Sequence, residues 1–151
     1  MPTLIRLLLA MLLLSGSGLR AAEPLHPIAV IVAHGAMLST LSRDELALIF
    51  KRKKRFWDDG SRIQPVNLPA AHPLRRAFSL DVFGRSPEDL DDYWRDMYFH
   101  GELPPYVLNS EEAVIRFVAD TPGAIGYVTH CLLDHRVSVI AQLDNGPACP
   151  K

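Results

Sequence analysis

The chain has 151 residues, of which 16 are basic, 17 are acidic and 48% are hydrophobic. This length makes about one domain, since typical domains have roughly 100 to 150 residues, and it is too short for two full lobes or a large multidomain enzyme. A net charge of −1 with 22% charged residues indicates a globular protein and argues against nonspecific nucleic-acid binding.

The start of the chain has the pattern of a secretory signal peptide over residues 1–22. Arg6 supplies an early positive charge, residues 7–14 are continuously apolar, and Ala21 and Ala22 are small residues suited to cleavage. The apolar run is shorter than the ~20 residues that span a bilayer. We therefore expect export to the periplasm, with no membrane-spanning segment left after cleavage.

The exported part begins with a strand and a helix. Residues 27–33 (PIAVIVA) form the continuous apolar run of a strand buried on both faces. Ser42 and Glu45 have the spacing of a capping box, which predicts a helix over about 43–51. The basic run 51–55 follows, where cations complement the helix dipole. It is either a docking patch for an anionic partner or a solvated helix end, and the second reading is the simpler one.

The remaining pattern alternates helices and strands. We expect an extended segment over 63–66, helices over 73–82, 86–101 and 110–119, and strands over 124–128 and 137–143. The third helix begins with a serine cap and has an apolar face made of Leu90, Tyr93, Trp94, Met97 and Tyr98. Strands separated by helices indicate an α/β domain with mixed or parallel pairing. This domain is expected over 23–143, with a tail over 144–151.

The tail carries one of the two cysteines. Cys131 and Cys149 lie 18 residues apart, and in an oxidising compartment a single pair most simply forms one disulfide. The bond would contribute about 3 kcal/mol of stability. The alternative is two thiols, one buried and one in the tail.

Catalytic and metal-binding motifs do not stand out. The sequence has no Gly-x-Ser-x-Gly elbow, Cys-x-x-Cys pair or His-Glu-x-x-His motif, although His130, Cys131 and His135 lie close together. We therefore expect neither an enzyme nor a bound metal or cofactor.

Two helix starts are candidate sites for an oxyanion. Thr40 and Ser42 lead into the first helix, and Arg75 and Arg76 open the second, just after His72. Unpaired N–H groups at a helix start carry partial positive charge, and guanidinium groups add bidentate contacts. Alternatively, the serine is only a cap and the arginines extend over the surface. The sequence favours neither reading.

Five segments occur in a distinctive order and spacing: 41–50 (LSRDELALIF), 57–63 (WDDGSRI), 65–67 (PVN), 75–78 (RRAF) and 122–128 (PGAIGYV). Together they resemble the periplasmic phosphate-binding-protein family, the substrate-binding component of phosphate uptake transporters. They are most similar to its short single-lobe members, labelled phosphate ABC transporter substrate-binding proteins. The resemblance covers about residues 28–128. It implies one α/β lobe of a type II periplasmic binding protein, with a mixed sheet flanked by helices.

In this family a loop reading Arg-x-x-x-Ser-Gly-Thr supplies much of the phosphate cradle. The equivalent stretch here has Leu68 at the arginine position, His72 at the serine position, and Pro73 and Leu74 at the last two. Leucine carries no charge and proline has no N–H donor. Since each lost charged hydrogen bond costs about 1.5 to 3 kcal/mol, the substitutions imply weak or altered anion binding.

The resemblance thus implies an exported, non-enzymatic solute-binding-like protein of the phosphate or anion transport class. Its candidate ligand contacts are Thr40, Ser42, His72, Arg75 and Arg76. Its partners would be a small phosphate-like oxyanion and a membrane permease or sensor protein. The alternative is a periplasmic interaction or sensor-accessory module that uses the lobe without a small-molecule ligand.

Overall fold

The computed structural model describes residues 26–36, 38–143, 146–147 and 149. The expected signal peptide over 1–22 and the greater part of the tail over 144–151 lie outside the described residues. The strands are β1 (Ile28–Ala33), β2 (Gln64–Asn67), β3 (Tyr106–Val107), β4 (Ala124–Thr129) and β5 (Val137–Leu143). The helices are α2 (Arg43–Phe50), α3 (Pro73–Phe83), α4 (Asp91–Phe99) and α5 (Glu111–Asp120), with 3-10 turns η1 (Glu88–Leu90) and η2 (His130–Leu132).

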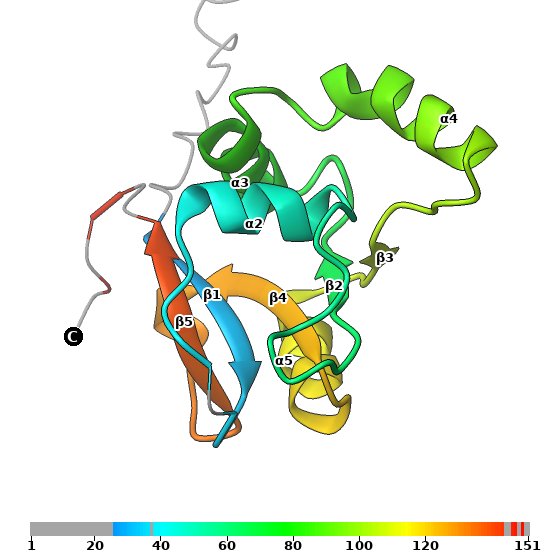
Figure 1. Ribbon diagram of the computed structural model, residues 1–151. Helices are drawn as coiled ribbons and strands as arrows, with labels where there is room; N and C mark the ends of the chain where they lie inside the picture. Colours follow the sequence, from blue (N-terminus) through cyan, green and yellow to red (C-terminus); the bar gives the residue numbers. More distant parts are fainter. Residues whose placement is uncertain (1–25, 37, 144–145, 148, 150–151) are drawn as a thin grey trace, which may run out of the picture.

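The strands form one mixed sheet in the order β3-β2-β4-β1-β5 (Figure 1). β2 runs parallel to both β3 and β4, whereas β1 runs antiparallel to β4 and β5. Residues 28–32 of β1 are at most 3% exposed. This confirms the strand, buried on both faces, that the apolar run predicts. The expected α/β class with a mixed sheet flanked by helices is confirmed.

Successive residues of β4 show that helices cover both faces of the sheet. A side chain built on Gly126 would meet Val114 and Val118 of α5, whereas the next residue, Tyr127, stacks on Phe78 of α3. Adjacent strand residues point to opposite faces. Therefore α5 covers one face, and α3 covers the other with α2 beside it (Figure 1).

An aromatic cluster attaches α2 and α3 to the sheet. The Phe78 and Tyr127 rings stack with centroids 3.9 Å apart and planes 4° from parallel. Phe50 of α2 meets Phe78 edge-on at 4.7 Å, and all three side chains are at most 1% exposed. Aromatic pairs of this kind contribute about 0.5 to 1.5 kcal/mol beyond the area they bury. The cluster therefore joins three elements that are distant in sequence.

The third expected helix differs from its prediction. Ser86 does cap the segment, because its Oγ accepts the Asp89 N–H at 3.3 Å, but the first turn is the 3-10 turn η1. No residue of α4 itself is buried, and Tyr98 and Phe99 are 64% and 79% exposed. Of the expected apolar face, Leu90 in η1 is only 3% exposed. The part of the face on α4 does not enter the core, because α2 and α3 already cover that face of the sheet and α4 extends away from it (Figure 1).

The basic run 51–55 makes contacts within the chain. The Lys51 ammonium lies over the rings of Phe83 and Tyr93. Lys54 lies 3.8 Å from the Glu45 carboxylate, and Arg55 pairs with Glu102. These contacts favour the reading of the run as a helix end that pairs with neighbouring groups.

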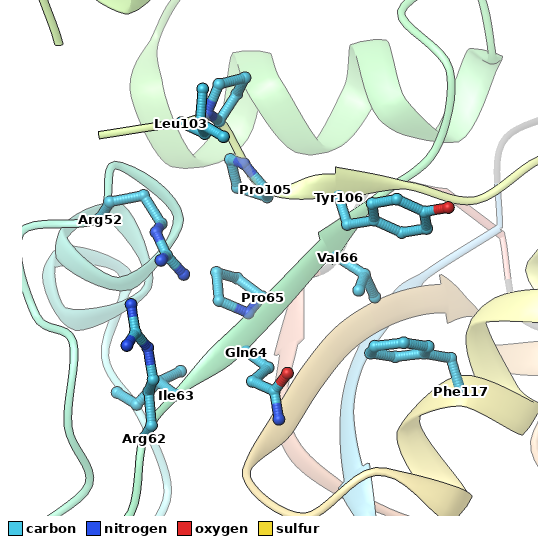
Figure 2. Close-up of a pocket in the computed structure, with 11 residues that line it drawn as sticks. Arg52, Arg62, Ile63, Gln64, Pro65, Val66, Leu103, Pro105, Tyr106 and Phe117 are labelled. Carbon is cyan, nitrogen blue, oxygen red and sulfur yellow. The ribbon is translucent and has the colours of Figure 1, made fainter. Parts of the chain in front are cut away.

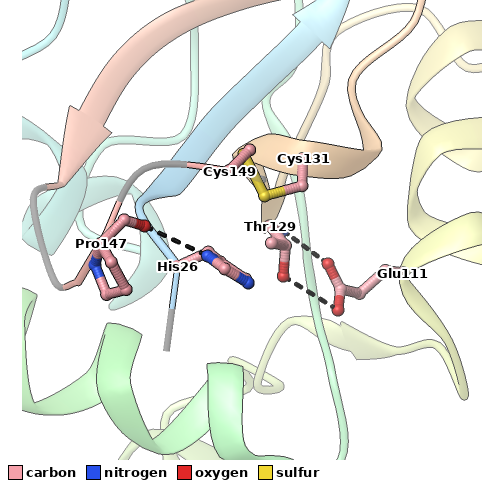
Figure 3. Close-up of a disulfide and its surroundings, with 6 residues drawn as sticks. All are labelled: His26, Glu111, Thr129, Cys131, Pro147 and Cys149. Atoms are coloured by element: carbon pink, nitrogen blue, oxygen red, sulfur yellow. Dashed lines mark hydrogen bonds between the residues drawn. A yellow bond between two sulfur atoms is a disulfide. The ribbon is translucent and has the colours of Figure 1, made fainter. Parts of the chain in front are cut away.

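The disulfide expected between Cys131 and Cys149 is present, with the two Cα atoms 5.4 Å apart (Figure 3). It joins the tail to the turn η2, which directly follows β4. Close by, the Nδ1 atom of His26 lies 3.1 Å from the carbonyl oxygen of Pro147. Both contacts attach the tail to the domain beside the start of β1.

Replacing Gly126 by alanine should destabilise the domain by overpacking. The new Cβ would lie 2.5 Å from Cγ1 of Val114, and overpacking of a core typically costs about 1 to 3 kcal/mol. Urea denaturation of Gly126→Ala, Val114→Ala and the double variant measures this. We expect the double variant to lose less than the sum of the single losses, because the second change removes the clashing methyl group. A stability loss in the double variant equal to the sum of the two single losses would contradict the close contact between residue 126 and Val114.

Removing the disulfide should lower the free energy of unfolding by about 3 kcal/mol, because the 18-residue loop is then open in the unfolded chain. Guanidinium denaturation of the Cys131→Ser/Cys149→Ser variant tests this. Reductant should destabilise the wild type equally and leave the double variant unchanged. Two titratable thiols in the unreduced native protein would show that the bond does not form.

Candidate functional site

The carboxyl ends of the parallel strands meet at one edge of the sheet. Asn67 ends β2 and Thr129 ends β4. The chain leaving β2 enters α3, and the chain leaving β3 enters α5, so two helix N-termini follow the same edge. In α/β proteins with parallel strands, ligands bind outside the carboxyl ends of the strands. This edge is therefore where a ligand-binding site is expected.

A buried polar network centred on Tyr127 lies at this edge. Its hydroxyl donates to Oδ1 of Asn67 at 3.2 Å and accepts the backbone N–H of Leu68 at 3.3 Å. Burial raises the pKa of Tyr127, and the neighbouring Arg75 guanidinium partly opposes that rise. The hydroxyl therefore remains protonated at neutral pH and can go on donating to Asn67.

Arg75, in the first turn of α3, is 8% exposed although it carries a full charge. Its guanidinium interacts with the Tyr127 hydroxyl, but its Nη1 atom is buried and has no hydrogen-bond partner among the described residues. A buried charged donor without a partner is costly, because burial removes its water. An anion at this position would supply the missing acceptor.

His72 is the N-cap of α3, because its Nδ1 accepts the backbone N–H of Leu74 at 3.2 Å. A neutral imidazole with Nδ1 acting as acceptor carries its proton on Nε2, which is then a donor. Pro73 occupies the first position of the helix and has no N–H. The start of α3 thus retains fewer backbone donors for an anion than an uncapped helix has.

Thr40 and Ser42 are exposed at the start of α2. Ser42 forms a complete capping box with Glu45, so a carboxylate already lies at this helix end. The hydrogen bonds from Ser42 hold the pKa of Glu45 below its usual range. The next residue, Arg43, pairs with Asp81 near the end of α3, whereas Arg75 is in the first turn of that helix. This geometry favours the interpretation of Ser42 as a cap.

The two arginines at the start of α3 differ in exposure and in their partners. Arg76 is exposed and its Nη1 donates to Glu88 at 2.6 Å, whereas Arg75 is buried beside Tyr127. The structure therefore brings Arg75 to the carboxyl edge of the sheet, and Arg76 faces the segment before α4.

Two residues at the carboxyl edge, Tyr127 and Glu111, are not among the ligand contacts expected from the sequence. Tyr127 lies within the PGAIGYV segment, but nothing local indicates that its hydroxyl reaches β2. Glu111, the first residue of α5, accepts hydrogen bonds from the backbone N–H and hydroxyl of Thr129 (Figure 3). Its negative charge acts on Tyr127 and therefore opposes anion binding nearby.

Comparison with solved structures shows that this is the fold of phosphate-type substrate-binding proteins, as the order of the sequence segments predicts. One match is a protein from Clostridium perfringens with bound phosphate, assigned as a phosphate ABC transporter substrate-binding protein: TM-score 0.62 and 20% identity over 75% of this chain and 43% of that one. An ABC-type phosphate transport receptor from Vibrio cholerae gives a TM-score of 0.61 and 19% identity over 75% of this chain and 44% of that one. PstS from Borrelia burgdorferi gives a TM-score of 0.55 and 14% identity over 85% of this chain and 51% of that one.

These likenesses show a shared fold, and the chain spans less than half of the first two structures. The neighbours are transport proteins rather than enzymes. No protein-family model matches the chain, and no curated protein matches its sequence.

Within the described part of the chain, no helix has the length and apolar character needed to cross a membrane. No group of three or more His, Cys, Asp or Glu side chains there is arranged to hold a metal ion.

Tyr127→Phe should destabilise the fold at neutral pH by about 1 to 3 kcal/mol, because Asn67 and the Leu68 N–H lose a buried partner. The pKa of Tyr127 is raised in the folded state, so its contribution is complete below its unfolded pKa of about 10 and is lost as pH rises through the folded value. Urea denaturation at neutral and alkaline pH should show the gap between wild type and variant narrowing. A gap independent of pH would contradict this.

Proposed function

We propose that this chain is an exported, non-enzymatic solute-binding-like protein that binds a small phosphate-like oxyanion weakly at the carboxyl edge of β2 and β4. The observation that carries the proposal is the buried Nη1 atom of Arg75, which has no partner among the described residues. The Nε2–H donor of His72 belongs to the same helix start. The shared fold with phosphate transport proteins supports the same class of ligand.

Several features of the edge indicate low affinity. Leu68 is a core residue that contributes no charge, and its N–H is already used by Tyr127. Pro73 removes one helix-start donor, and Glu111 places a carboxylate nearby. Two lost charged hydrogen bonds weaken binding by roughly two to four powers of ten. We therefore expect a dissociation constant in the millimolar range rather than the tight capture suited to a scavenging transporter.

Transport would require partners outside this chain. A membrane permease is the partner that a substrate-binding protein implies, and a second lobe from another chain could close over the open edge. Thr40 and Ser42 stay as candidate contacts for a ligand or lobe approaching from outside, since both are exposed, whereas Arg76 is paired with Glu88.

A second candidate function is that of a periplasmic interaction or sensor-accessory module. The observation that favours it is α4, which has no buried residue and exposes Tyr98 and Phe99. Exposed aromatic side chains are enriched at protein interfaces. A partner, such as a permease or a sensor protein, would then recognise this helix without a small-molecule ligand.

Isothermal titration calorimetry of the domain with phosphate and sulfate tests the first function. We expect Arg75→Gln to weaken binding by roughly 10- to 150-fold, the equivalent of one charged hydrogen bond. Arg76→Gln is the matched control, because it removes the same charge from the next residue while its guanidinium is paired with Glu88. If the wild type gives no binding signal with either anion at millimolar concentrations, oxyanion binding is contradicted and the interaction module is favoured.

A further inference from the structure

A groove opens at the other end of β2, on the amino-terminal side of the parallel strands. It has a volume of about 210 Å³, and its walls include Pro65 of β2, Pro105 before β3 and Phe117 of α5 (Figure 2). β2 and β3 pair only at Val66–Tyr106 and Asn67–Val107. Proline has no N–H donor for a ladder, so the pairing does not extend back through Pro105 and the strands separate.

Arg52 brings a cation to this groove from an unfavourable backbone conformation. It follows the C-cap Lys51 of α2 and has a φ of 61°. It is the one non-glycine residue with positive φ in the described part of the chain. Helices usually place glycine at this position, because a side chain costs energy in the left-handed region. An arginine here indicates that its side chain makes interactions that compensate for the unfavourable backbone conformation.

The Arg52 side chain is held over the groove, only 17% exposed. Its Nε atom is buried and makes no hydrogen bond to the described residues. Arg52 forms an ion pair with Glu102, whose Oε2 lies 3.8 Å from that Nε, a distance too long for a hydrogen bond. The other oxygen of Glu102 is bonded to Arg55. This single carboxylate therefore leaves an excess of positive charge at the groove.

Arg62 adds a second cation from the opposite side. Its guanidinium and that of Arg52 point toward one another beside Pro65 (Figure 2). Arg62 is exposed, and its side chain has no ion pair with the described residues. Two like charges repel unless an anion lies between them, and paired guanidinium groups match the two oxygens of a carboxylate.

The rest of the groove determines what else the ligand carries. Beyond the arginines, the walls include the apolar surfaces of Pro65, Pro105, Tyr106 and Phe117 (Figure 2). Gln64 also lines the groove, and its side-chain amide donates to the carbonyl oxygen of Pro122. The volume is below the roughly 300 Å³ at which pockets for drug-sized ligands begin. The ligand that fits is therefore small, with one anionic group and an apolar body.

We propose that this groove is a second binding site, for a small organic carboxylate with an apolar or aromatic body. The carboxylate lies between the guanidinium groups of Arg52 and Arg62, and the body packs on Pro65, Pro105 and Phe117. The site lies at the opposite end of β2 from Arg75 and does not depend on oxyanion binding at the carboxyl edge.

Calorimetry with benzoate, acetate and inorganic phosphate tests the site on the full exported domain. We expect benzoate to bind in the millimolar range, as suits so small a ligand, and more tightly than acetate or phosphate. Arg52→Gly and Arg62→Gln should each weaken benzoate binding at least about tenfold, the loss of one charged hydrogen bond. Lys53→Gln is the matched control, because it removes an exposed positive charge next to Arg52 and should change the affinity less than about twofold.

Arg52→Gly also separates binding from folding. Glycine suits the left-handed conformation, so thermal melting of this variant should show a Tm at or above that of the wild type while benzoate binding is lost. The proposal is overturned if the wild type does not bind benzoate, if acetate binds equally well, or if Lys53→Gln weakens binding as much as Arg62→Gln. Loss of benzoate binding in Arg75→Gln would assign the ligand to the carboxyl edge instead.

Discussion

The contact between Tyr127 and Phe78 is the interaction on which the rest of this structure depends. The stacked rings join β4 to α3, and Phe50 extends the cluster to α2. The same tyrosine uses its hydroxyl to hold Asn67 and Leu68 at the end of β2. One side chain thus serves both the core and the carboxyl edge, so packing and the position of the candidate site are coupled.

The two ends of β2 present different chemistry. At the carboxyl edge, a buried guanidinium, a helix start and a nearby glutamate are arranged around Tyr127. At the amino end, proline residues separate the strands, and Arg52 and Arg62 point toward one another over an apolar floor. The first arrangement suits a compact oxyanion and the second a carboxylate with an apolar body, because only the second offers apolar surface for the rest of a ligand.

The neighbouring structures give the fold a context without determining the activity. The fold is shared with phosphate transport proteins at 19–20% identity, over less than half of their length. Binding depends on donors and charges at a few atoms, which the same backbone can present or omit. The affinity expected here therefore follows from Leu68, Pro73 and Arg75 rather than from the fold.

The sequence by itself determined the elements whose signals are local. The apolar run of β1 and the Ser42–Glu45 cap appear in the structure as expected, because each depends on periodicity or spacing over a few residues. The disulfide also appears as expected, because the chain has only two cysteines to pair. Tertiary structure alone decided which distant groups meet. The parallel pairing of β2 with β4 brings Asn67 to Tyr127, 60 residues away. The same long-range packing left α4 outside the core, since no local pattern records that a sheet face is already covered.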